Sequence, residues 1–137
     1  MTYLTHRKGI GQSTKLISSR IQVQHVEFAK ELAFNFNKFA NKALETLIHD
    51  LQTDHLTANT TYHLTYSGGA FVGYSEDGYG STPKMLRIRC DLLEYLEMNM
   101  YKVNTALNLA IERWRDYYKQ GRIADYVIHD LQKRGKY

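Results

Sequence analysis

The sequence predicts an α+β, helix-rich fold that contains two copies of one strand-then-helix unit, with a β-hairpin inserted between them. The first observation is a repeat: residues 20–51 match the chain again sixty-seven positions later, without a gap. The matching identities include Asn37 with Asn104 and Asn41 with Asn108. In each copy, the spacing of apolar residues changes from two, typical of a strand, to three or four, typical of a helix. The segment between the copies is rich in Thr, Tyr, Gly and Ser, which favours strands joined by turns.

Composition and charge indicate a globular protein with a polyanionic partner. Of the 137 residues, 43% are hydrophobic and 23% charged, a balance that argues against a disordered chain. The net charge of +4 is unevenly distributed, because no Asp or Glu precedes Glu27 and basic residues cluster around Arg87. Clustered cations favour a polyanion such as nucleic acid. With no signal-peptide-like run and no apolar stretch of about eighteen residues, we expect a cytoplasmic protein without a membrane partner.

The N-terminal part of the chain divides into an arm and a strand. Residues 1–15 combine Gly and basic side chains without a hydrophobic period, and we expect a flexible basic arm. From Leu16, apolar and polar residues alternate. This alternation predicts a half-buried strand with Ser18, Arg20 and Gln22 on its outer face.

The remainder of the first copy, which spans 16–52, has a helical pattern. Apolar residues recur at steps of three and four from Val26 to Leu51, which places them on one stripe of a helix. Two arrangements fit this stripe. The first is one long helix. The second is a pair of helices in which Asn35 or Asn37 caps the second helix, since an Asn side chain accepts a hydrogen bond from a free backbone amide.

Residues 53–83 form the insert. The runs 62–66 and 70–74 are rich in aromatic and β-branched residues, and they flank Ser67-Gly68-Gly69. Two such runs around a Gly-containing turn predict a β-hairpin.

The second copy, 84–120, begins with another alternating strand. Met85, Arg87 and Arg89 lie on its predicted outer face, and the apolar residues between them lie on the inner face. The strand therefore repeats the polar, cationic outer face of the first copy.

A helical stripe follows in residues 91–120, again as one helix or two. Asp91 is the predicted N-cap, with Glu94 three positions later completing a capping box. Gly121 is predicted to end the helical segment. Residues 121–137 are predicted to form a short helix and a basic tail.

Signatures of catalysis are absent from the sequence. The six histidines lack metal-ligand spacing, and the lone Cys90 has no partner for a zinc site. The glycines of the insert do not form a phosphate-binding loop, and no Ser or Cys lies in a nucleophile-elbow motif. We therefore expect no enzyme activity, no metal and no cofactor.

The repeated unit resembles the ribbon-helix-helix DNA-binding unit of the Arc and MetJ type. The residues that carry the resemblance are the alternating strands and the helical segments 37–48 and 104–114. Two units in one chain are similar to the tandem arrangement of conjugative relaxosome accessory proteins. The resemblance implies that the two strands pair into an antiparallel ribbon within an intramolecular pseudo-dimer. It also implies that the ribbon lies in the major groove.

The resemblance implies specific roles for residues of both copies. The residues expected to contact bases are Ser18, Arg20, Gln22, Met85, Arg87 and Arg89. Arg pairs with guanine, Gln with adenine, and Met with a thymine methyl group. The residues expected to contact phosphate are Lys15, Asn37, Lys38, Lys84, Lys102, Asn104 and Thr105. The leading interpretation is a sequence-specific double-stranded-DNA-binding protein, either a repressor or a plasmid or phage architectural factor, with further copies on adjacent half-sites.

A second interpretation is a small plasmid- or phage-encoded inhibitor or adaptor that binds another protein. Its contact surface would be the hairpin, because aromatic side chains are common anchors of protein interfaces. The anchors would be Tyr62, Tyr66, Phe71 and Tyr74. In this interpretation the long helices mediate dimerisation.

Overall fold

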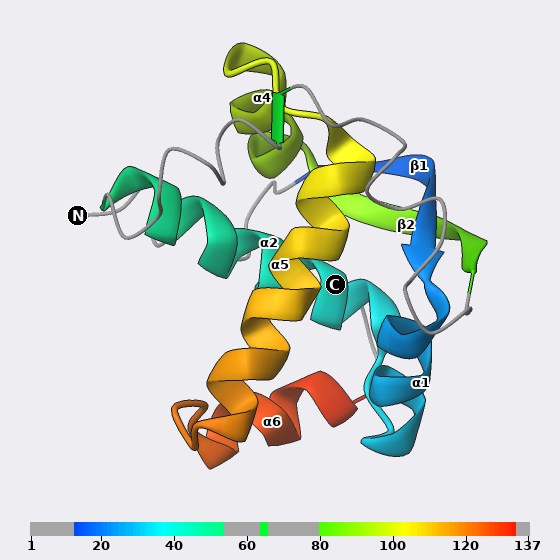
Figure 1. Cartoon of the computed structure of the whole chain (residues 1–137), viewed down its shortest axis with the longest axis vertical. Coiled ribbons are helices and arrows are strands. Elements are labelled where there is room, and N and C mark those ends of the chain that lie inside the picture. Colours follow the sequence, from blue (N-terminus) through cyan, green and yellow to red (C-terminus); the bar gives the residue numbers. More distant parts are fainter. Residues whose placement is uncertain (1–12, 54–63, 66–79, 134–137) are drawn as a thin grey trace.

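A computed structural model describes residues 13–53, 64–65 and 80–133 (Figure 1). In these residues the fold is α+β and helix-rich, with five helices and one two-stranded antiparallel sheet. This confirms the α+β, helix-rich part of the predicted fold class. Most of the predicted arm and most of the predicted hairpin lie outside the described residues. No helix among the described residues is both long and apolar enough to cross a membrane.

The two strands form an antiparallel ribbon. Strand β1 is Thr14–Gln22 and strand β2 is Ser81–Arg89, so each begins two or three residues earlier than predicted. Alternation holds within the ribbon, because Ile21, Leu86 and Ile88 are almost fully buried on its inner face. A one-residue shift in either strand would expose these side chains, so their burial specifies the register.

Each helical stripe is divided into two helices. In the first half these are α1 (Val23–Glu31) and α2 (Phe36–Gln52); in the second half they are α4 (Cys90–Met98) and α5 (Val103–Lys119). Ala33 and Met100, in the connecting turns, have φ of 57° and 58°, the left-handed conformation that ends a helix. The Asn35 side chain accepts a hydrogen bond from the amide of Lys38 and so caps α2. Two helices, not one, follow each strand.

The elements of the second half lie at a constant distance along the chain from those of the first. β2, α4 and α5 begin and end sixty-seven residues after β1, α1 and α2. The two left-handed residues, Ala33 and Met100, obey the same offset. The repeat seen in the sequence is therefore also present in the backbone conformation.

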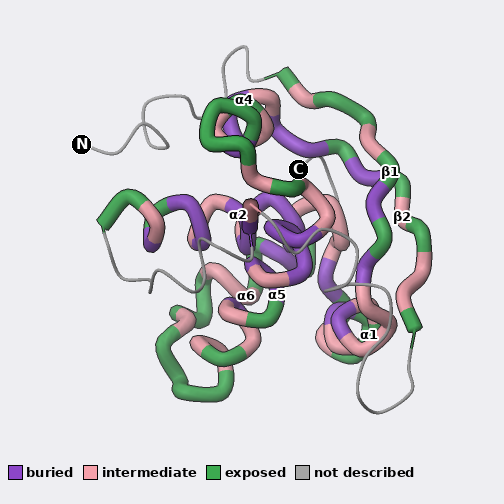
Figure 2. Tube along the Cα trace, turned by 45° about the horizontal axis from the view of Figure 1, so that its top comes forward, coloured by how far each residue is buried: buried purple, intermediate pink, exposed green. Residues whose placement is uncertain are grey.

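The core lies between the ribbon and the crossed helices α2 and α5 (Figure 2). Trp114 of α5 packs edge-on against Phe39 of α2 and Phe34, with ring centroids 5.1 and 5.7 Å apart. Helix α6 (Asp125–Gln132) packs against the start of α2, where the Asn35 amide donates to the Leu131 carbonyl over 2.7 Å. Burial of large side chains from both halves produces one shared core.

Two helix ends test the capping predictions. Asp91 is not the N-cap of α4, because the helix begins at Cys90 and the Asp91 carboxylate binds the Arg89 guanidinium instead. This predicted capping box is therefore wrong. Gly121 has φ of 72° just beyond the end of α5, and its amide donates to the Tyr118 carbonyl. The predicted helix end at Gly121 is confirmed.

Candidate nucleic-acid interface

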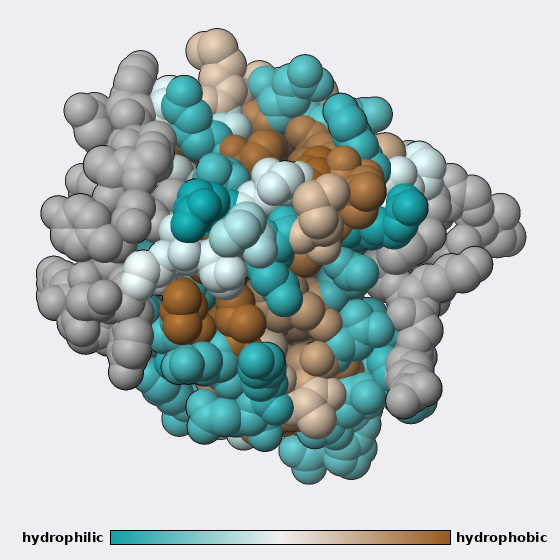
Figure 3. Space-filling view, turned by 90° about the vertical axis from the view of Figure 1, so that its right-hand side faces the viewer, coloured by the Kyte–Doolittle hydropathy of each residue, from teal (hydrophilic) through white to brown (hydrophobic). Residues whose placement is uncertain are grey.

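The outer face of the ribbon is an exposed surface formed by three residues from each strand. These residues are Leu16, Ser18, Arg20, Pro83, Met85 and Arg87. They lie in three cross-strand pairs: Leu16 with Arg87, Ser18 with Met85, and Arg20 with Pro83. Ser18 and Met85 are also sixty-seven residues apart, so their pair is the centre of the ribbon. Figure 3 views the ribbon side of the molecule, where apolar patches lie among hydrophilic side chains.

The two arginines of the outer face occupy equivalent positions, one on either side of the centre. Arg20 donates through Nε to the Ser81 hydroxyl and through Nη2 to the Ser81 carbonyl, both over 2.8 Å. Arg87 is exposed, and its guanidinium makes no hydrogen bond or ion pair with any residue that the structure describes. Neither strand contains Asp or Glu, so the two guanidinium groups are the formal charges among the six outer-face residues.

Two buried asparagines attach the ribbon to the helices. The Asn41 side chain of α2 donates to the Arg87 carbonyl and accepts from the Arg89 amide, over 2.9 Å each. The Asn108 side chain of α5 does the same in the other strand, donating to the Arg20 carbonyl and accepting from the Gln22 amide. A primary amide satisfies one donor and one acceptor of an extended strand at once. The repeated asparagines therefore hold the backbone that carries the two exposed arginines.

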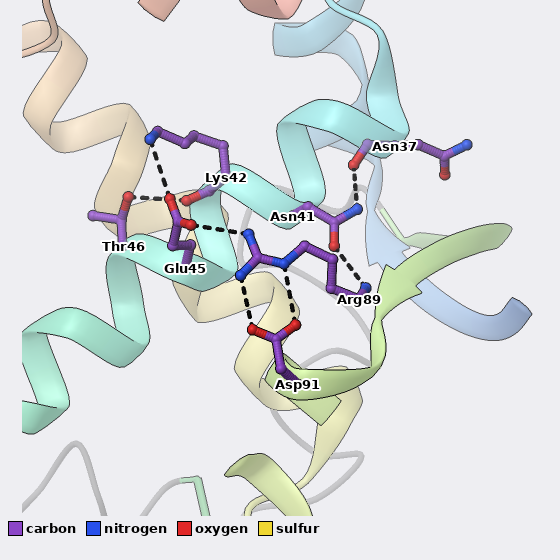
Figure 4. A network of polar contacts seen from close by, with 7 residues as sticks. All are labelled: Asn37, Asn41, Lys42, Glu45, Thr46, Arg89 and Asp91. Carbon is purple, nitrogen blue, oxygen red and sulfur yellow. Dashed lines mark hydrogen bonds and ion pairs between the residues drawn. The ribbon is translucent and has the colours of Figure 1, made fainter. Parts of the chain in front are cut away.

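Arg89, predicted on the outer face, is buried, with 8% of its surface exposed. Its guanidinium binds Asp91 through two hydrogen bonds and Glu45 through a third of 2.9 Å (Figure 4). Burial by itself would lower the pKa of Arg89, but the hydrogen bonds to Asp91 and Glu45 outweigh it and raise the pKa. Arg89 is thus unavailable for a base contact, contrary to the prediction. It lies at the end of β2, where the chain turns into α4.

Gln22, the counterpart of Arg89, is half-buried at the end of β1. The outer face is centred on the Ser18–Met85 pair. It therefore extends to Leu16 and Pro83, near the start of each strand, and stops before Gln22 and Arg89 at the strand ends. Neither Leu16 nor Pro83 was among the residues predicted to contact bases. Alternation places both residues on the outer side of their strands, but only the pairing register shows that they, and not Gln22 and Arg89, complete the face.

The four lysines predicted to contact phosphate differ in their surroundings. Lys15 and Lys102 are exposed, and the Lys84 ammonium lies 5.2 Å from the ring centroid of Phe36, the first residue of α2. Lys38 is turned toward α6, where its ammonium donates to the Asp130 carbonyl.

The remaining members of the predicted phosphate set contact the ribbon or are buried. The Asn37 side chain accepts from the Arg87 amide, and the Asn104 side chain accepts from the Ser19 hydroxyl. The Thr105 side chain is fully buried. These contacts place the first turns of α2 and α5 beside the ribbon, one at each strand.

The alternative interface, Tyr62, Tyr66, Phe71 and Tyr74, lies outside the described residues. Within the part of the chain that is described, no group of three His, Cys, Asp or Glu side chains is placed to hold a metal ion. No family model matches the chain, and no curated protein or solved structure matches it.

Proposed function

We propose that the chain is a sequence-specific double-stranded-DNA-binding protein that reads the major groove with its antiparallel ribbon. In this proposal the two strand-helix-helix units form an intramolecular pseudo-dimer of the ribbon-helix-helix type. The observation that carries the proposal is the outer face of the ribbon, on which Arg20 and Arg87 are exposed at equivalent positions without a carboxylate in either strand.

The chemistry of the outer face supports base recognition. A two-stranded ribbon fits the major groove of B-DNA. Arg20 and Arg87 match the O6 and N7 acceptors of guanine, Ser18 can pair with several base edges, and Met85 suits a thymine methyl group. The inner face is buried against the core, so only the outer face can approach the DNA.

Groups beside the ribbon support binding to the DNA backbone. The N-termini of α2 and α5 flank the ribbon, and a helix N-terminus favours phosphate because its first amides and its dipole are positive. Lys84 lies near the start of α2, and Lys102 immediately precedes α5. These contacts would position the ribbon without specifying sequence. A cytoplasmic repressor or a plasmid or phage architectural factor, bound at adjacent half-sites, fits this mode of binding.

The test is fluorescence anisotropy with labelled duplex DNA, first of random sequence and then of a site selected from a random pool. We expect wild-type binding to weaken steeply between about 50 and about 200 mM salt. Replacing Arg20 or Arg87 with Ala should weaken binding to the selected site by about 1–3 kcal/mol each.

The matched control is the double variant Lys30→Ala/Lys119→Ala, which also removes two exposed cations, from the C-terminal ends of α1 and α5. It should retain both the affinity for the selected site and the preference for it. Equal losses in the control and in Arg20→Ala/Arg87→Ala would show that net charge alone drives binding. No binding at low salt would exclude the proposed function.

A further inference from the structure

The two halves of the outer face differ in chemistry although their backbones are equivalent. Of the three equivalent pairs, only Arg20 and Arg87 have the same side chain. The other two pairs are Leu16 with Pro83 and Ser18 with Met85. A pseudo-symmetric ribbon therefore presents an asymmetric set of contacts.

Apolar surface is concentrated on the Arg87 side of the ribbon. Leu16 is the cross-strand partner of Arg87 and is 49% exposed, and Met85 precedes Arg87 on the same face of β2 and is 61% exposed. Covering the exposed surface of such large apolar side chains with a partner is favourable, because it removes apolar surface from water. In the major groove, the apolar group available to cover them is the thymine methyl.

The Arg20 side of the ribbon has Ser18 and Pro83 where the Arg87 side has Met85 and Leu16, and its arginine is more constrained. Ser18 lies beside Arg20, and Ser81 takes the Nε–Nη2 edge of its guanidinium through two hydrogen bonds. The edge formed by the two terminal nitrogens still has hydrogens for a bidentate contact with guanine. No exposed Leu or Met belongs to this half of the outer face.

The spacing of the arginines sets a second constraint. Each lies two residues from the central pair, in opposite directions along the ribbon. Four residues of strand span about 13 Å, which corresponds to about four base pairs of B-DNA. Since the pseudo-dyad of the ribbon exchanges the two DNA strands, the arginines would meet guanines on opposite strands.

We propose that this protein reads a non-palindromic DNA site in one orientation, an inference that rests on the proposed function. The site has guanines on opposite strands about four base pairs apart. Next to the guanine bound by Arg87 it has thymine, whose methyl group contacts Met85 and Leu16. The other guanine is bound by Arg20. The base beside it faces Ser18 and need not be thymine.

The experiment selects binding sites from a random duplex pool with the full chain and then replaces single thymines of the recovered site with deoxyuracil. Deoxyuracil keeps the base pair and removes only the methyl group. At the thymine beside the Arg87 guanine, wild-type affinity should fall about fourfold, the effect of losing one buried methyl group. In Met85→Ser the same replacement should have little effect.

A second variant tests the origin of the asymmetry. Ser18→Met gives both halves a central methionine, so selection should then recover thymine on both sides and a more nearly palindromic site. Ser18→Ala is the control and should recover the wild-type site.

Three outcomes distinguish the claims. A non-palindromic site whose methyl dependence disappears in Met85→Ser supports the inference. A palindromic site, or one insensitive to deoxyuracil, overturns the inference while leaving DNA binding intact. Enrichment of no sequence overturns the proposed function and the inference with it.

Discussion

Arg87 and Arg89 lie two positions apart on one strand, yet their environments are opposite. The Arg87 guanidinium is exposed on the outer face, whereas the Arg89 guanidinium is buried between the carboxylates of Glu45 and Asp91. A buried guanidinium is stable only when it is paired, and removal of one partner leaves the other charges uncompensated. The same residue type is thus exposed to solvent at one position and stabilises the fold at the other.

We expect Arg89→Ala to lower the free energy of unfolding by about 3–5 kcal/mol, because it removes the cation from beside the buried Asp91 carboxylate, whereas Glu45 keeps its ion pair with Lys42. Arg87→Ala should change it by less than about 0.5 kcal/mol, as an exposed substitution does. Urea denaturation of the two variants beside the wild type measures both values. Similar values for the two variants would contradict the assignment of Arg89 to the interior.

His25 is a buried titratable group of α1, 2% exposed. Its Nδ1 atom lies 3.1 Å from Nη1 of Arg115, an arrangement in which Arg donates and a neutral imidazole accepts. Burial, reinforced by the positive charge of Arg115, lowers the pKa of His25 from 6.5 to about 3. The folded protein therefore holds this imidazole neutral at pH values where the unfolded chain protonates it.

Stability should consequently fall as the pH decreases from 6.5 toward 3, by about 1.4 kcal/mol per pH unit well inside this window. The unfolded state binds a proton there that the folded state does not, which gives the sign. The variant His25→Leu has at this position the residue type of its counterpart in the second half, Leu92. In this variant the free energy of unfolding should change much less between pH 7 and pH 5. Urea denaturation across that range provides the test, and equal slopes in both proteins would exclude His25 as its source.

At the scale of elements, the inter-helix turns show how each stripe becomes two helices. Ala33 and Met100 adopt the left-handed conformation, which costs a residue with a Cβ about 1–2 kcal/mol. Both side chains are exposed, so neither is held there by burial of its own surface. The conformation persists because tertiary contacts on both sides determine the path of the turn, such as the bond from the Asn35 amide to the Leu131 carbonyl.

We expect Ala33→Gly to stabilise the protein by about 0.5–1 kcal/mol, since relief of the left-handed strain exceeds the added entropy of the unfolded chain. The control is Lys30→Gly, an exposed position within α1, which should destabilise by about 1 kcal/mol. Thermal denaturation followed by far-UV circular dichroism separates the two. A destabilised Ala33→Gly protein would mean that the turn is not strained.

At the scale of the whole molecule, the two halves cannot bury their surfaces separately. β1 pairs only with β2 in the described sheet, and α2 packs on α5. Asn41 and Asn108 each bind the strand of the other half. The hydrophobic core likewise mixes residues of both halves. Cooperative unfolding of the whole structure follows from this mutual dependence.

We therefore expect one transition, with Trp114 fluorescence and circular dichroism coinciding in urea. Trp114, the only tryptophan, belongs to the second half. Asn41→Ala, in the first half, should shift both signals equally by about 2–3 kcal/mol, because it removes the side-chain partner of the buried Arg89 amide and of the part-buried Arg87 carbonyl in β2. A shift of circular dichroism alone would indicate that the halves unfold independently.

The helix-rich α+β class, the two alternating strands and the amphipathic stripes could be predicted from the sequence alone. Each of these depends on residue type and spacing within a single segment: Ile21 and Ile88 occupy inward positions of their strands, and Gly121 permits a left-handed helix end. Local periodicity is sufficient for such features, because it records which face of an element is buried.

The strand register, the division of each stripe at Ala33 and Met100, and the burial of Arg89 became clear only from the three-dimensional structure. Register depends on a partner strand more than fifty residues away, and it moved the outer face from Gln22 and Arg89 to Leu16 and Pro83. Arg89 occupies a polar position in the sequence alternation of its strand, yet it is buried, because Asp91 and Glu45, the latter from another helix, pair with its guanidinium. Interactions between distant segments have no periodic signature in one sequence, so they are decided by packing of the whole chain.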